Sequence, residues 1–209
     1  MPLARGSGLL NRPLSDVLNA LASPHELPGG GPAAALAAAA AAALTAKVAR
    51  GSRQTWIEAG GAIAHAEALR MQTQALIDRD ADAYHEASAV LARDERSARR
   101  GVAMPAGTAA LPVGDRERIV DEALFQAADL ALAIADAASE IAQLAAAVAR
   151  ECPKPMRPDA LTAVALAEAA ACASAGLVAV NRKLAADDPR RASAVEAAQA
   201  AQGARERAG

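Results

Sequence analysis

The sequence predicts an all-α fold, an antiparallel bundle of long, alanine-rich helices that forms a single domain over residues 1–209. Hydrophobic residues make up 53% of the 209 residues, which is enough to bury a core. The chain has only one Trp, one Tyr and one Phe. Alanine is abundant, and it favours helices and is depleted in strands. Because each buried alanine removes little apolar area from water, stability needs long interfaces. We therefore expect a homodimer interface as well.

The first half of the chain predicts three helices. The first starts at a Ser15 or Asp16 cap and ends before Pro24. The second is the alanine stretch, and the third has apolar residues at helical spacing. Gly60 and Gly61 are a weak point in the third helix, where we expect a kink or a close contact. The three expected ranges are 14–22, 32–50 and 54–99.

The second half predicts three more helices. Glycine and proline signals in 101–114 mark a loop, and Asp115 is a suitable cap for the helix that follows. Prolines within 153–158 make a rigid break, and residues 187–189 form a turn before the last helix. The three expected ranges are 115–150, 159–186 and 190–207.

Charge and cysteine content argue against several classes of function. The net charge is −2 and no basic patch is concentrated, since residues 93–100 alternate in sign. Nucleic-acid binding is therefore disfavoured. Cys152 and Cys172 have no metal-ligand spacing, so we expect no metal site and reduced thiols. No signal peptide is visible, and the stretch 33–46 is too short for a membrane span. We expect a soluble cytoplasmic protein with no membrane partner.

The most informative segment is Pro28-Gly29-Gly30-Gly31-Pro32, which leads directly into the alanine run. Three glycines leave no side chains in the way, and proline suits the first turn of a helix. The segment therefore predicts a bare helix N-terminus whose free N–H groups can receive an anionic or carbonyl-bearing ligand. A tight turn into a buried helix accounts for the same residues.

Three acidic residues fall on one predicted helical stretch: Asp78, Asp80 and Asp82. Asp80 shares a helical face with Tyr84, and Asp78 shares one with Asp82, each at i, i+4 spacing. Carboxylates held together on a partly buried face can act as acid or base. A solvated helix face explains the same pattern.

Two further polar residues stand out in the second half. Asp159 follows three prolines at the start of a predicted helix, where a helix cap is its simplest role. Asn181 lies in an otherwise apolar stretch and needs hydrogen-bond partners if it is buried. A polar contact between helices is the simplest account of that residue.

Four features in the same order characterise a known family. They are Leu14–Leu18, the glycine segment with its alanine-rich helix, the stretch Ile77–Tyr84, and Asp159 followed by Ala163, Glu168 and Asn181. With these features the chain resembles the cyclodeaminase/cyclohydrolase family, which includes the C-terminal domain of formiminotransferase-cyclodeaminase and its stand-alone bacterial relatives. The resemblance covers nearly the whole chain.

The resemblance implies an all-helical dimer that acts on one-carbon derivatives of tetrahydrofolate. One family activity closes 5-formimino-tetrahydrofolate to the methenyl ring with release of ammonia. The other hydrolyses 5,10-methenyl-tetrahydrofolate to 10-formyl-tetrahydrofolate. By this resemblance, Asp80 stabilises the cationic carbon and moves protons, and Asp159 positions or assists it.

The same resemblance implies how the substrate is bound. The backbone of Gly29–Gly31 approaches the pteridine or a polar group, and Asn181 supplies a hydrogen bond. Asp82 and Tyr84 belong to the same binding set. The tetrahydrofolate derivative is the substrate, and no metal or redox cofactor is implied.

The sequence also departs from the family pattern. Pro32 stands where a serine commonly follows the glycines, and Cys152-Pro153 replace a Gly-Asn pair. Ala131 replaces a proline, and Leu177 replaces an asparagine. These changes remove polar groups from the expected ligand loop and its surroundings. The alternative is therefore a catalytically degenerate folate-binding protein, or a structural helical dimer of the same fold.

Overall fold

The computed structural model describes residues 8–24, 29–100, 113–181 and 184–209, and within 80–100 and 113–116 it describes the backbone alone. These residues are mostly helical, and no strand occurs within the described ranges, so the all-α prediction is confirmed. The elements are η1 (Leu9–Asn11), α1 (Leu14–Ala22), α2 (Gly30–Gly51), α3 (Ala59–Arg100), α4 (Val113–Glu151), η2 (Lys154–Met156), α5 (Arg157–Val180) and α6 (Pro189–Ala208).

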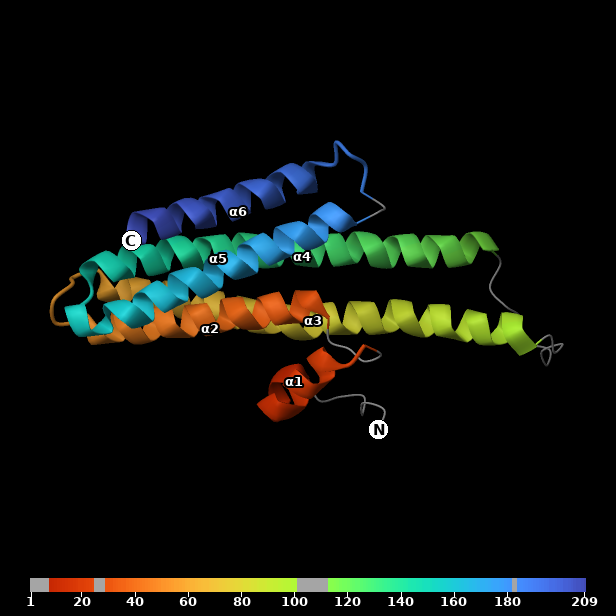
Figure 1. Cartoon of the computed structure of the whole chain (residues 1–209), viewed down its shortest axis with the longest axis horizontal. Coiled ribbons are helices and arrows are strands. Elements are labelled where there is room, and N and C mark those ends of the chain that lie inside the picture. The colour runs from red at the N-terminus through yellow and green to blue at the C-terminus, as the bar shows by residue number, and fades with distance from the viewer. Residues whose placement is uncertain (1–7, 25–28, 101–112, 182–183) are drawn as a thin grey trace.

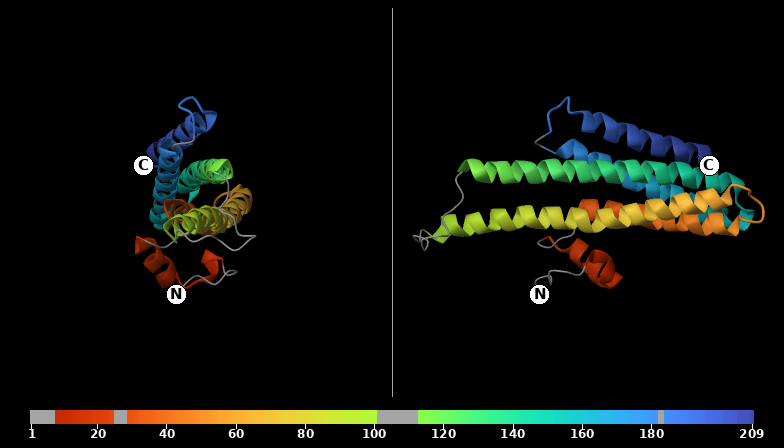
Figure 2. Two further views of the ribbon diagram at one scale, coloured as in Figure 1. Left: turned by 90° about the vertical axis from the view of Figure 1, so that its right-hand side faces the viewer. Right: turned by 180° about the vertical axis from the view of Figure 1, so that it is seen from behind.

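The five long helices run up and down as an antiparallel bundle (Figures 1 and 2). The beginning of α2 lies against the end of α5, and the end of α2 lies beside the beginning of α5. Helices α3 and α4 extend beyond the other three on one side (Figure 1). The short helix α1 lies outside the bundle, below α2 and α3 in that view.

Alanine builds the centre of the bundle. Ala38 and Ala42 of α2 pack with Ala142 of α4, Ala167 of α5 and Ala204 of α6, and each of these residues is fully buried. Because alanine projects only a methyl group, the helices can pack closely without large rings between them. The largest fully buried side chains are isoleucines and valines, which confirms a core built from small and branched residues.

Three of the described helical segments are long and apolar enough to cross a membrane, by length and composition only. They are Gly30–Gly51, Glu117–Glu151 and Lys154–Val180. The expectation that the alanine stretch is too short for a span is therefore wrong, since α2 has 22 residues. In the most apolar 18-residue window of each segment, 61% is buried inside the bundle in the first, 61% in the second and 39% in the third. The expected absence of a membrane partner stays a prediction.

Three helices have other N-caps than the sequence predicts. Pro13 is the N-cap of α1 and no side chain caps that helix, so the expected Ser15 or Asp16 cap is wrong. The φ of proline is already that of a helix start, which explains the difference. Asp115 lies inside α4, which begins two residues earlier. Asp159 lies in the first turn of α5 and is not its cap, because that helix begins at Arg157.

The third and fifth helices are shorter than expected. The backbone N–H groups of Thr55 and Trp56 both donate to the Ser52 carbonyl oxygen, so these residues form turns. Helix α3 begins only at Ala59. Gly60 and Gly61 therefore lie in its first turn, and no described atom outside the helix lies within 4 Å of a Cβ at either position, so the expected kink or close contact is wrong. Helix α5 ends at Val180 and leaves the helical conformation at residue 181. The loop expected at 101–114 falls mostly outside the described residues.

Candidate functional site

One end of the bundle brings together the start of α2, the end of α5 and part of α3. A Cβ placed on Gly30 would lie 3.6 Å from Cδ2 of Leu177, so these two helices are in direct contact here. Ile77 of α3 packs with Ala34 and Ala35 of α2. We call this end of the bundle the glycine end, and the opposite end, which holds Asp159, the Asp159 end.

The start of α2 is a bare helix N-terminus, as the glycine segment predicts. Gly29 occupies the N-cap position with φ −100° and ψ −155°, and no side chain caps the helix. Gly29 and Gly30 are exposed, whereas Gly31 and Pro32 are buried. First-turn N–H groups have no acceptor within their own helix. The exposed ones carry the positive end of the α2 dipole and suit an anion or a carbonyl oxygen.

The acidic stretch of α3 lies at the same end. Asp78 accepts a hydrogen bond at its Oδ1 from the Leu9 N–H, 2.6 Å away. A Cβ on Gly8 would overlap the same carboxylate, so the backbone of residues 8–9 is fitted closely against Asp78. Asp78 thus holds the N-terminal segment on α3. It is not on a freely solvated face.

The other acidic residues of the stretch are described by their backbone only. Asp80 follows Ile77 by three helical positions, which places its backbone about 4.5 Å farther along α3. Since Ile77 packs on Ala34, this level of α3 is near the first turn of α2. The side chains of Asp80, Asp82 and Tyr84 lie outside the described part of the chain. Their roles stay predictions.

Asn181 also belongs to the glycine end. It is 9% exposed and forms the C-cap of α5, one turn beyond Leu177. Its Nδ2 donates to the Leu124 carbonyl oxygen at 2.6 Å, and its own carbonyl accepts from Arg191. The expected polar contact between helices is therefore confirmed. A hydrogen bond to a substrate stays a prediction.

Asp159 is at the other end of the bundle. Its Oδ2 forms an ion pair with Lys47 Nζ at 2.6 Å, and its side chain is 42% exposed. Lys47 lies about 25 Å along α2 from Gly30, at about 1.5 Å per residue. The structure therefore does not bring Asp159 to the glycine segment within one chain. A role beside that segment needs a second copy of the chain.

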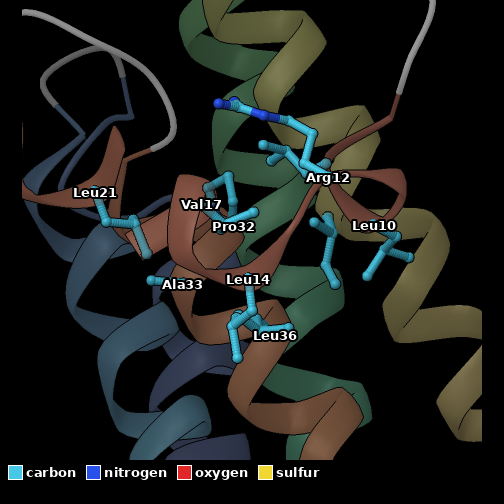
Figure 3. Close-up of a pocket in the computed structure, with 10 residues that line it drawn as sticks. Leu10, Arg12, Leu14, Val17, Leu21, Pro32, Ala33 and Leu36 are labelled. Carbon is cyan, nitrogen blue, oxygen red and sulfur yellow. The ribbon is translucent and has the colours of Figure 1, made fainter. Parts of the chain in front are cut away.

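A cavity of about 150 Å³ opens beside the start of α2 (Figure 3). Most of its walls are aliphatic, and Arg12 is the one charged side chain that lines it. The lining residues are Leu9, Leu10, Arg12, Leu14, Val17, Leu21, Pro32, Ala33, Leu36 and Ile77. The sequence analysis missed this cavity. The only sequence features that pointed to the cavity were the arginine directly before Pro13 and the leucine-rich helix that follows.

The described groups with shifted pKa values do not line this cavity. Hydrogen bonds from Arg50 and Arg70 lower the pKa of Glu67, and a hydrogen bond from Arg190 lowers that of Asp188. Desolvation raises the pKa of Asp136. In the part of the chain that is described, no group of three His, Cys, Asp or Glu side chains is placed to hold a metal ion. The glycine end is therefore distinguished by its cavity and by a helix start that no described side chain caps.

The sequence profile of the formiminotransferase-cyclodeaminase family matches residues 13–200. The chain belongs to this family. A crystal structure of formiminotetrahydrofolate cyclodeaminase from Thermotoga maritima matches it with a TM-score of 0.72. The match covers 96% of this chain and 95% of that one at 20% identity, so it shows a shared fold. A comparison with curated proteins finds no match.

Two departures from the formiminotransferase-cyclodeaminase pattern fall at the glycine end. Pro32 is buried in the first turn of α2 and lines the cavity. Leu177 covers the backbone of Gly30 with its side chain. By contrast, Ala131 is buried within α4, and Cys152 packs in an apolar cluster at the Asp159 end. The departures that face the start of α2 are therefore apolar.

Proposed function

We propose that the protein is a folate one-carbon enzyme. It hydrolyses 5,10-methenyl-tetrahydrofolate or cyclises 5-formimino-tetrahydrofolate with release of ammonia. The observation that carries the proposal is the meeting of the bare start of α2, the Asp80 level of α3 and the Asn181 end of α5 in a member of this family.

The chemistry takes place at a carbon held between two nitrogens. In hydrolysis, a water oxygen bonds to the methenyl carbon and gives up its proton, and the bond to N5 then breaks as N5 is protonated. In cyclisation, N10 bonds to the formimino carbon, and ammonia leaves with the N10 proton. Both reactions involve an amidinium-like cation that a carboxylate stabilises, and both need a proton carrier. We assign both tasks to Asp80.

The remaining groups bind the substrate. The N–H groups of Gly29–Gly31 suit a carbonyl or anionic group at the α2 start. Asn181 supplies a hydrogen bond at the end of α5, and Asp82 and Tyr84 complete the set. No metal or redox cofactor enters this proposal. We place the enzyme in the cytoplasm, where a folate-type substrate is its partner.

The alternative is a catalytically degenerate protein that binds a folate or serves only as a structural dimer. The apolar departures Pro32 and Leu177 favour it, since Pro32 lies in the first turn of α2 and the Leu177 side chain of α5 contacts Gly30. A folate that binds only the native state must raise the melting temperature. A melting shift without turnover supports a binding protein, and no shift at high folate supports a structural role.

The test follows the ultraviolet absorbance of 5,10-methenyl-tetrahydrofolate, with ammonia release from the formimino substrate as a second assay. We expect the protein to accelerate one of these reactions, and Asp80→Ala to slow it. Asp187→Ala is the matched control, because Asp187 is an exposed aspartate in the turn before α6. Rates equal to buffer in both assays would reject the enzymatic proposal.

We also propose that the enzyme is a homodimer. Large apolar side chains are exposed around the glycine end, among them Leu14 at 62%, Leu18 at 54% and Val180 at 73%. Covering these side chains removes apolar area from water. Sedimentation at micromolar concentration checks this, and a clean monomer contradicts it.

A further inference from the structure

The cavity beside α2 has the size and lining of a site for one aromatic ring. Its volume is about 150 Å³, and its walls come from η1, α1, the first turns of α2 and Ile77 of α3. An apolar cavity of about this volume in another protein stays dry and binds benzene. In Figure 3, Leu14 is drawn next to Leu36 and Val17 next to Pro32, and all four line the cavity. An aryl ring is therefore a better match for this space than a polar group.

Arg12 gives the same cavity one strong polar group. Its Nη1 is buried and has no hydrogen-bond partner among the described residues. The guanidinium lies to one side of the aliphatic side chains in Figure 3. A buried donor without a partner is costly, and a guanidinium pairs best with a carboxylate, which it can bind with two parallel hydrogen bonds. The natural partner of Arg12 is therefore an anion on the ligand.

We propose that this cavity is a subsite for an aromatic carboxylate, with the ring held by the aliphatic walls and the carboxylate held by Arg12. Resting on the proposed function, we assign it to the aminobenzoylglutamate part of the folate. Pro32 and Ala33 line the cavity and also belong to the first turns of α2. A ligand held here lies beside the helix start. Its pteridine can then extend toward the glycine segment and Asp80.

The direct test measures binding of p-aminobenzoylglutamate by titration calorimetry to the full chain. We expect Arg12→Gln to raise the Kd about tenfold or more, because hydrogen bonds to charged groups are among the stronger ones. Arg12→Lys should recover part of the affinity by keeping the charge. Arg53→Gln is the matched control, since Arg53 is exposed in the turn after α2. An unchanged Kd in Arg12→Gln, or no binding by the wild type, overturns the subsite.

Two further ligands identify what the subsite recognises. Neutral p-aminobenzamide should bind the wild type and Arg12→Gln equally, because it has no carboxylate. Simple benzoate should bind more weakly than p-aminobenzoylglutamate. Benzoate that binds as tightly, with the same dependence on Arg12, overturns the assignment to a folate tail and points to free aromatic acids.

Kinetics separate this inference from the proposed function. In turnover of the methenyl or formimino substrate, Arg12→Gln should raise KM and leave kcat within about twofold, since Arg12 binds a part of the substrate that does not react. An active enzyme whose KM does not change overturns the subsite and leaves the proposed function standing. An inactive wild type that still binds p-aminobenzoylglutamate through Arg12 overturns the function and keeps the subsite. Circular dichroism and melting temperature confirm that each variant folds.

Discussion

The two ends of the bundle are built from the same alanine-rich helices, yet the polar groups around the start of α2 differ from those around its end. At the Asp159 end, Lys47 pairs with Asp159, and Arg50 and Arg70 both pair with Glu67. At the glycine end, no described side chain caps α2, and Arg12 Nη1 has no partner among the described residues.

Apolar side chains differ between the ends as well, although exposed ones occur at both, since Ile57 at the Asp159 end is 98% exposed. At the Asp159 end, Trp56, Cys152 and Met156 pack against a buried cluster. At the glycine end, Leu14 and Leu18 are exposed and a cavity remains between α1 and α2. Both ends form ion pairs, since Arg190 pairs with Asp188 and Asp129 near the end of α5, but only the glycine end combines an exposed helix start with a cavity among the described residues. This difference supports the proposal that the site lies at the glycine end.

The largest expected difference between the two ends comes from replacing one aspartate at each end with a neutral residue. We expect Asp80→Asn to lower kcat by about 10²- to 10⁴-fold, the range for loss of a general acid or base. We expect Asp159→Asn to leave kcat within about twofold, because its partner is Lys47 at the far end. Turnover of the methenyl substrate measures both. A large loss in Asp159→Asn would instead show that a second copy of the chain brings Asp159 to the site.

A smaller contrast concerns stability. Asn181→Ala removes the amide that donates to the Leu124 carbonyl from a nearly buried position, which should cost about 1–2 kcal/mol of unfolding free energy. Lys47→Ala breaks an exposed ion pair and should cost less than about 1 kcal/mol. Urea unfolding of both variants measures the difference. Equal costs would contradict the contrast between the two ends.

Glycine substitutions probe the closeness of packing at the two ends. Gly61→Ala, in the first turn of α3, meets no atom within 4 Å and should stabilise by up to about 1 kcal/mol, because alanine favours helices. Gly8→Ala places a methyl group on the Asp78 carboxylate and should loosen the bond to Leu9. Thermal unfolding checks the first variant. Weaker p-aminobenzoylglutamate binding checks the second, and equal binding would contradict the close fit at Asp78.

The smallest expected effect is the pH dependence at the Asp159 end. Arg50 and Arg70 lower the pKa of Glu67 in the folded chain, so this group contributes stability above its unfolded pKa of about 4.3. That contribution is lost as the pH falls through the lower, folded pKa. In Glu67→Gln, the free energy of unfolding should therefore fall slightly less than in the wild type as the pH is lowered through the acid range. An unchanged acid limb between the wild type and Glu67→Gln would contradict this role.

Much of the fold could be predicted from periodicity and composition. The helix over Leu14–Ala22 has the predicted ends, and α2 and α6 differ by only one or two residues at either end. The errors lie at boundaries such as Ala59 and Val180, where turns and caps decide. The glycine segment and Asn181 could be named in advance, because glycine runs and buried amides have local signatures. The cavity at Arg12 could not, because its walls come from four separate elements.

By itself, the sequence determined an alanine-rich helical bundle with a bare helix start, since helix propensity and glycine geometry act locally along the chain. Only the tertiary structure decided which polar residues meet. It placed Asn181 and the Asp80 level of α3 at the glycine end and Asp159 at the opposite end. The physical reason is helix direction and register. In an up-and-down bundle, packing between neighbouring helices fixes which residues share an end, and no short stretch of sequence specifies that packing.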